Sequence, residues 1–164
     1  MATALRIRPA MSDDADSIAE FNCRLAMESE GRSLEPATIA AGVRTVLEGR
    51  GEAEYLIAES DGCAIGQLML TREWSDWRNG WFYWIQSVFV VPEQRRQGVF
   101  SRLYQEAVTR VEARTDTVGL RLYVEAHNQK AQETYLKLGM RVTGYEVLEH
   151  PLRRELPAIA PQKN

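Results

Sequence analysis

The sequence predicts a mixed α/β fold, in which a central mixed sheet is flanked by helices in the order β-α-α-β-β-β-α-β-α-β. Apolar residues recur at helical spacing in separate stretches, and the β-prone runs between them are bounded by turn pairs such as Asp61-Gly62 and Asn79-Gly80. A chain of 164 residues with 45% hydrophobic residues can bury one substantial core. We therefore expect a single domain over residues 1–164, with a core over about 5–148 and a weakly ordered tail over 150–164.

The first half of the chain is expected to supply one strand, two helices and a hairpin. Alternating apolar and polar residues favour a first strand, Ser12 is a suitable helix N-cap, and Pro36 suits the first turn of a helix. A polar connection over 28–35 separates the two helices. The expected elements are a strand over 5–8, a helix over 12–27, a helix from Pro36 that stops at Gly49, and strands over 55–58 and 64–70.

The second half begins with the longest β-prone run of the chain, residues 81–91, which we expect to be the central strand. An apolar face that includes Val99, Leu103 and Ala107 predicts a helix after it. The remaining expected elements are a strand over 120–124, a helix over 128–138 that is ended by Gly139, and a final strand over 140–148.

Charge and the N-terminal sequence favour a cytoplasmic protein that binds neither nucleic acid nor membranes. Charged residues make up 26% of the chain and the formal net charge is -3, so no global basic field exists. The N-terminus lacks the apolar core of a signal peptide, and no run approaches the roughly 20 apolar residues that span a bilayer. Cys23 and Cys63 lack metal-ligand spacing, and His127 and His150 are isolated, so no metal site is expected.

The join between the long strand and the next helix has the composition of an anion site. It reads Arg95-Arg96-Gln97-Gly98-Val99-Phe100-Ser101. Backbone amides at a helix start lack intrahelical partners, Gly98 permits close approach, and the two arginines add charge that suits a diphosphate. The same residues are also compatible with an ordinary solvated turn, because short glycine patterns are common by chance.

This join resembles the cofactor loop of the GNAT acetyltransferase superfamily, Gln/Arg-x-x-Gly-x-Gly/Ala, which follows the fourth strand and holds the pyrophosphate of CoA. Phe100 departs from the pattern by replacing Gly or Ala, and we expect its side chain to join the apolar face of the helix. A second segment resembles the family's Asn-x-x-Ala-x-x-x-Tyr-x-x-x-Gly-Phe motif. Its matching positions are Asn128, Ala131, Tyr135 and Gly139, with Met140 in place of Phe.

The resemblance implies a GNAT-like acyl-CoA N-acyltransferase fold. It also implies an enzyme that transfers the acetyl group of acetyl-CoA, as cosubstrate, to an amine of a small molecule or peptide by direct attack. In this family the position of Tyr135 supplies the general acid that protonates the departing thiolate, that of Asn128 contacts the pantetheine arm, and that of Ala131 leaves room for it. A tyrosine that only packs against its neighbours fits the same spacing.

The implied cofactor site also includes backbone amides of the long strand, exposed where a β-bulge turns it away from the next strand. The residues implied to bind the cofactor are Val88, Phe89, Val90, Arg95, Arg96, Gln97, Gly98, Val99, Phe100, Ser101, Asn128, Ala131 and Tyr135. Gln86 holds the position expected of a general base and cannot act as one. Glu125 and His127 are candidate bases, although each is also compatible with a solvated strand-end residue.

The aromatic segment leaves several interpretations open. All four tryptophans lie between Trp74 and Trp84, which suits a core, a homodimer interface, or an acceptor pocket to which Trp77, Tyr83 or Trp84 contributes.

The function also has an alternative. Phe100 in the loop and Gln86 at the base position fit a catalytically weak CoA-binding sensor or interaction module of the same fold. Glu28 and Glu30 either attract a cationic acceptor or are simply solvated.

Overall fold

The computed structural model describes residues 5–150 and 152. The chain forms two compact units, which divide between His127 and Asn128. Apart from residues 150 and 152, the expected tail over 150–164 lies outside the described residues, and the single domain stays a prediction. Among the described residues, none of the helices is long and apolar enough to cross a membrane.

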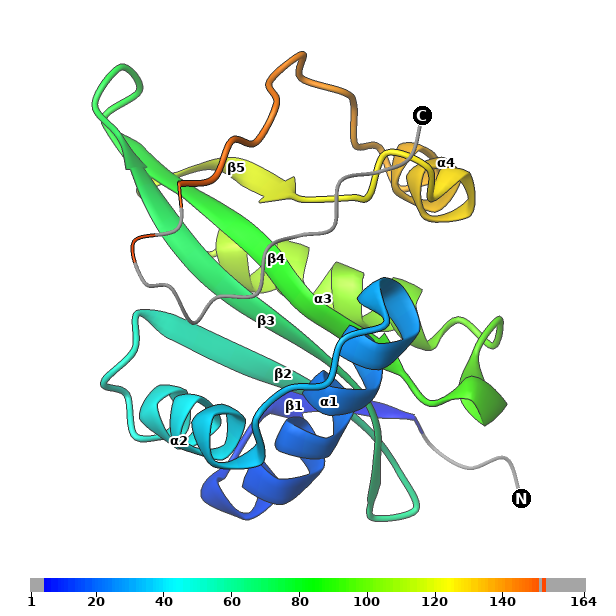
Figure 1. Cartoon of the computed structure of the whole chain (residues 1–164). Coiled ribbons are helices and arrows are strands. Elements are labelled where there is room, and N and C mark those ends of the chain that lie inside the picture. Colours follow the sequence, from blue (N-terminus) through cyan, green and yellow to red (C-terminus); the bar gives the residue numbers. More distant parts are fainter. Residues whose placement is uncertain (1–4, 151, 153–164) are drawn as a thin grey trace. The chain divides into compact units, whose positions relative to one another are not determined.

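The first unit is built on a mixed five-stranded sheet with the order β1-β2-β3-β4-β5 (Figure 1). Neighbouring strands are antiparallel except β4 and β5, which run parallel. The predicted class of a mixed sheet flanked by helices is thus confirmed. The strands are β1 (Arg6–Pro9), β2 (Ala53–Ser60), β3 (Cys63–Ser75), β4 (Gly80–Val90) and β5 (Thr117–Leu122), so the last one begins earlier than predicted.

Helices α1 (Ala15–Glu30) and α2 (Pro36–Leu47) cover one face of this sheet, and α3 (Val99–Glu112) covers the other (Figure 1). The core under α1 and α2 is built from Ile18, Val43, Tyr55 and Ile57. The face that α3 buries consists of Val99, Leu103, Tyr104, Ala107 and Val111, as its apolar spacing predicts.

The helix starts follow local hydrogen bonding. α2 begins at Pro36 as predicted, because the Glu35 carboxylate accepts hydrogen bonds from the amides of Ala37 (3.0 Å) and Thr38 (2.6 Å). α1 is preceded by the short 3-10 helix η1 (Ser12–Asp14) and has Asp14 as its N-cap, so the cap predicted at Ser12 is wrong by two residues. α1 also runs to Glu30, so part of the expected polar connection is helical.

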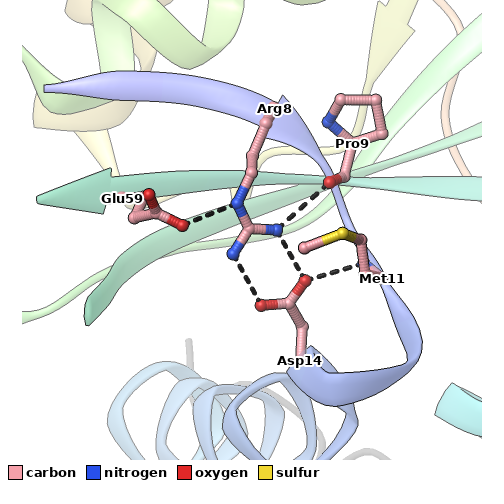
Figure 2. A network of polar contacts seen from close by, with 5 residues as sticks. All are labelled: Arg8, Pro9, Met11, Asp14 and Glu59. Carbon is pink, nitrogen blue, oxygen red and sulfur yellow. Dashed lines mark hydrogen bonds and ion pairs between the residues drawn. The ribbon is translucent and has the colours of Figure 1, made fainter. Parts of the chain in front are cut away.

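The entry to α1 is held by Asp14 (Figure 2). Its carboxylate accepts hydrogen bonds from the amide of Met11 (2.7 Å) and from two guanidinium nitrogens of Arg8 (2.7 and 2.9 Å). Arg8 Nε also donates to Glu59 on β2 at 2.7 Å. Hydrogen bonding from Arg8 lowers the pKa of Asp14, although burial opposes this shift. One partly buried cluster therefore joins β1, β2 and the start of α1.

The second unit contains α4 (Gln129–Lys137). Asn128 caps this helix by accepting a hydrogen bond from the amide of Ala131 at 3.1 Å, and Gly139, in a left-handed conformation (φ +94°), follows its end. The predicted final strand over 140–148 is not found: this whole segment is described and contains no strand. Its residues are mostly exposed, and local β propensity alone provides no neighbouring strand for hydrogen bonding.

Candidate active site

A β-bulge interrupts β4 where it pairs with β3. Gln67 on β3 lies opposite Phe89, but the next pair is Met69 opposite Gln86, so β4 has one residue more than β3 between these pairs. Ser87 takes a left-handed conformation there (φ +51°), which is strained for a residue other than glycine. A bulge takes backbone groups out of regular pairing and redirects them. The resemblance implied such a bulge in this strand.

β4 and β5 separate next to this bulge. Their pairing ends at Ile85 on β4, whereas β4 itself continues to Val90. The stretch 86–90 therefore lies beyond the paired part of β5. Phe89 and Val90 are buried and Val88 is half-buried, so their backbone rather than their side chains is suited to contact a ligand.

β4 leads through the short 3-10 helix η2 (Pro92–Gln94) into the start of α3. Arg96 (φ +62°) and Gly98 (φ +82°) both adopt left-handed conformations on the way. A Cβ added to Gly98 would meet no atom within 4 Å, so the space beside this residue is open. The hydrogen bond from Arg102 N to Gly98 O (3.1 Å) closes the first turn of α3. Amides earlier in such a turn have no intrahelical acceptor and carry the positive end of the helix dipole.

Phe100 lies in this first turn without disturbing it. The side chain is half-buried, and its ring centroid is 6.2 Å from that of Tyr104 on the apolar face of α3. Packing with this face is what the sequence predicts for a residue that replaces the small residue of the family pattern.

Arg95 is held between β4 and α1. Its Nε donates to the backbone oxygen of Val90 (2.8 Å), and a terminal nitrogen donates to Glu28 on α1 (2.6 Å). The guanidinium carbon also lies 5.5 Å from the centroid of the Phe89 ring. Glu28 is therefore paired with Arg95 rather than simply solvated. Sequence reasoning missed this pair because its partners are 67 residues apart and share no local pattern.

A chain of uncharged polar side chains lies behind the bulge. Gln67 Nε2 donates to Asn22 Oδ1 (2.9 Å) and to the backbone oxygen of Ser87 (3.2 Å), and Asn22 Nδ2 donates to the hydroxyl of Tyr55 (3.2 Å). Asn22, Tyr55 and Gln67 are buried. Burial raises the pKa of Tyr55, while hydrogen bonding to Asn22 and Ser87 opposes this shift. Sequence reasoning missed these hydrogen bonds. Their one local signal is a polar residue, Gln67, in an apolar strand.

A cavity of about 460 Å³ lies between α1, α2 and the sheet. One wall is polar and is formed by Asn22, Tyr55 and Ser87. Ser87 belongs both to this wall and to the bulge, so the cavity reaches the part of β4 that lies beyond β5. The other walls are largely apolar and include Leu25, Leu34, Ile39, Val43, Val46 and Met69.

Gln86, at the position expected of a base, and the candidate bases Glu125 and His127 have other contacts. Gln86 Nε2 donates to Thr71 Oγ1 at 2.8 Å, which holds this side chain along the sheet. A Glu125 carboxylate oxygen accepts a hydrogen bond from the amide of His127 at 3.0 Å, and both residues are exposed beyond β5. This contact is compatible with the interpretation of both as solvated residues at the end of the strand. A base role for Glu125 stays a proposal.

The aromatic residues of the tryptophan-rich segment lie in different environments. Trp77 is 86% exposed in the turn between β3 and β4. Tyr83 is buried, and its hydroxyl accepts a hydrogen bond from Arg114 (2.7 Å). Trp84 stacks on Tyr123 with ring centroids 4.5 Å apart. None of these three candidate pocket residues is among those that line the cavity.

Tyr135, the candidate general acid, belongs to α4 in the second unit. It is half-buried, and burial raises the pKa of its phenol. The phenol therefore keeps its proton at neutral pH, which a general acid requires.

Comparison with known proteins identifies similar sequences and folds. Residues 17–140 match the acetyltransferase (GNAT) family. The crystal structure of a possible acetyltransferase from Clostridium difficile 630 is 40% identical, has a TM-score of 0.84, and is matched over 91% of this chain and 98% of that chain. None of the curated proteins matches the sequence.

Two more distant structures show the same fold. A "predicted acetyltransferase with acetyl-CoA" from Clostridium acetobutylicum is 18% identical, with a TM-score of 0.74 over 91% of this chain and 97% of that chain. A ribosomal-protein-alanine N-acetyltransferase from Brucella melitensis biovar Abortus 2308 is 17% identical, with a TM-score of 0.73 over 92% and 100% of the two chains. At these identities the likeness concerns the fold alone.

Proposed function

The chain belongs to the GNAT family of acetyltransferases, and from this premise we propose that it is an N-acetyltransferase. It transfers the acetyl group of acetyl-CoA to an amine of a small molecule or peptide by direct attack. The observation that carries the proposal is the continuous path of one segment: the bulge of β4, the stretch beyond β5, and the start of α3 at Gly98 follow one another directly.

The start of α3 supports a site for the pyrophosphate of CoA. The open space beside Gly98 lets an anion approach the first-turn amides, and the helix dipole favours negative charge there. We assign the phosphates to the amides of Gln97, Val99 and Ser101 and to the side chain of Arg96. Arg95 already pairs with Glu28 at 2.6 Å, so a direct contact with phosphate requires that pair to open. We therefore give Arg95 the role of ordering the loop.

Backbone groups of β4 support the acetyl site. Acetyl-CoA supplies the acetyl group as an activated thioester. Those amides of Val88, Phe89 and Val90 that face away from β3 donate hydrogen bonds to the carbonyl oxygen, on which negative charge develops as the amine attacks. The pairing of β4 with β5 ends at Ile85, which supports the proposal that amides beyond this residue can bind a ligand.

Proton transfer completes the proposed reaction. As the carbon–sulfur bond breaks, Tyr135 donates its phenolic proton to the sulfur, and the attacking nitrogen loses a proton to Glu125 or to water. The place of Tyr135 in the motif from Asn128 to Gly139, and its protonated state at neutral pH, support this role. Asn128 and Ala131 border the pantetheine arm in the same proposal.

A second candidate function is a CoA-binding sensor with little catalysis. It is favoured by Gln86, whose side chain is held by Thr71 at the position where the family commonly has a base.

Location and assembly belong to the same proposal. We propose a cytoplasmic location, and we infer the lack of a nucleic-acid partner from the net charge of -3. The exposed Trp77 supports a homodimer.

Isothermal titration with acetyl-CoA tests what the enzyme and the sensor share. Saturable binding is expected, and no heat of binding up to about 1 mM ligand, the upper end of common KM values, contradicts both functions. Release of free thiol across a panel of amines then separates them, because only the enzyme releases thiol in proportion to an acceptor.

A further inference from the structure

The cavity between α1, α2 and the sheet has the composition of an acceptor site. We propose that it holds the body of a compact, mostly apolar monoamine, whose nitrogen lies at the bulge beside Ser87. This inference rests on the proposed function, because it assigns an acceptor class to the same reaction.

The charges around the cavity disfavour acceptors with several cationic groups. Of the described residues that line it, Glu30 is the only one with a formal charge, and its carboxylate pairs with Arg32 at 3.1 Å. A polyamine or an aminoglycoside brings several ammonium groups, and each loses hydration without gaining a counter-charge. One amine, which must become neutral before it attacks, avoids this cost.

The size and the apolar walls suit a small molecule. A cavity of about 460 Å³ lies within the usual range for small-ligand sites. Leu25, Ile39 and Met69 come from α1, α2 and β3, so an apolar body is covered from three sides. Removal of that body from water provides the main binding free energy.

The hydrogen bonds of the polar wall have a direction. Gln67 donates to Asn22, and Asn22 donates to the hydroxyl of Tyr55, which is thereby left with its own proton to donate. Tyr55 and Ser87 both line the cavity, so their hydroxyls lie at the proposed position of the acceptor nitrogen. The oxygen of such a hydroxyl can accept an N–H of a neutral amine, which leaves the lone pair of the nitrogen free to attack the thioester. The wall can therefore hold the acceptor nitrogen without occupying the electron pair that attacks.

Gly42 offers a direct test of the cavity. It lines the cavity from α2, and an added Cβ would meet no atom within 4 Å. Gly42→Leu therefore fills the cavity from a helical position, where leucine is a better helix former than glycine. The neighbouring Ala41 is exposed and does not line the cavity, so Ala41→Leu is the matched control. Ala26→Leu, on the α1 wall, is a second filling variant in case Gly42→Leu fails to fold.

Binding of phenethylamine and of spermidine is measured by calorimetry, with and without saturating CoA. We expect saturable binding of phenethylamine to the wild type and to Ala41→Leu, about tenfold weaker binding to the filling variant, and weaker binding of spermidine than of phenethylamine. No phenethylamine binding, an unchanged affinity in the filling variant, or tighter binding of spermidine overturns the inference.

Titration of the same proteins with acetyl-CoA separates this inference from the proposed function. If acetyl-CoA binds and any amine is acetylated while phenethylamine does not bind, the cavity assignment is wrong and the proposed function stands. If phenethylamine binds as expected but acetyl-CoA does not, the proposed function fails, and the cavity is a binding site for apolar amines without that reaction.

Discussion

At the scale of single residues, two arginines each connect elements that are distant in sequence. Arg8 on β1 reaches Glu59 on β2 and Asp14 at the entry of α1, and Arg95 connects β4 with Glu28 on α1. A guanidinium has several donors in a fixed plane, so it can satisfy two partners that approach from different directions, which the single ammonium of lysine does less well.

Asp14→Asn should lower the free energy of unfolding by about 2 kcal/mol at pH 7, because it removes the charge that accepts two hydrogen bonds from the half-buried Arg8. The folded pKa of Asp14 is depressed, so this stabilisation is present above the unfolded pKa of about 3.9 and is lost as the pH falls through the folded value. Urea unfolding of both proteins at pH 7 and in acid measures the difference.

The exposed neighbour Asp13 provides the control, and Asp13→Asn should change stability little. A deficit of Asp14→Asn that stays constant from pH 7 down to about pH 3 would contradict this account of the cluster.

Tyr135→Phe should lower kcat by about 100-fold while the affinity for acetyl-CoA stays the same, because only the proton donor is removed. The pKa of Tyr135 is raised by burial, so the wild type should keep this acid through neutral pH and lose it only above the ordinary tyrosine value of about 10. Steady-state rates at neutral pH measure the first effect, and wild-type rates followed up to about pH 11 measure the second. Tyr145→Phe, at an exposed tyrosine of the same unit, is the control, and equal losses in the two variants would remove the catalytic role of Tyr135.

At the scale of elements, the path from β4 into α3 contains three residues with an unusual backbone conformation. Ser87, Arg96 and Gly98 all have positive φ within this segment. Strained or left-handed residues persist only where the surrounding structure stabilises them, and they gather at ligand sites. Here β3 and α3 provide that support on either side of the segment.

Gly98→Ala should lower the free energy of unfolding by about 1 kcal/mol, because alanine is strained at φ +82° although the space for its Cβ is open. It should also weaken acetyl-CoA binding, since the methyl group enters the proposed phosphate site. Gly42→Ala is the matched control: in a helix interior it should add up to about 1 kcal/mol of stability and leave acetyl-CoA binding unchanged. Thermal unfolding and calorimetric titration of both variants decide the point, and equal acetyl-CoA affinities would argue against a phosphate site at Gly98.

At the scale of the whole molecule, local patterns predict the elements better than their partners. The spacing of α3, the proline at the start of α2 and the two turn pairs each act within a few residues, and the corresponding elements form. The predicted strand over 140–148 is different, because a strand depends on a neighbour that its own residues do not specify.

The candidate site shows the same difference between local signals and long-range contacts. The loop around Gly98 was recognisable because its signal is contiguous in the sequence. The chain from Gln67 through Asn22 to Tyr55 joins three elements, and each member alone resembles an ordinary polar residue. Long-range hydrogen bonds of this kind appear only once the fold brings their partners together.

The central claim is acetyl transfer from acetyl-CoA to an amine. The most direct test incubates the purified protein with acetyl-CoA and a panel of amines that includes phenethylamine, spermidine and a short peptide, and follows the mass of each amine. We expect a gain of one acetyl group on at least one amine, together with an equal amount of free CoA. Saturable binding of acetyl-CoA without acetylation of any amine would contradict the enzyme and favour the sensor.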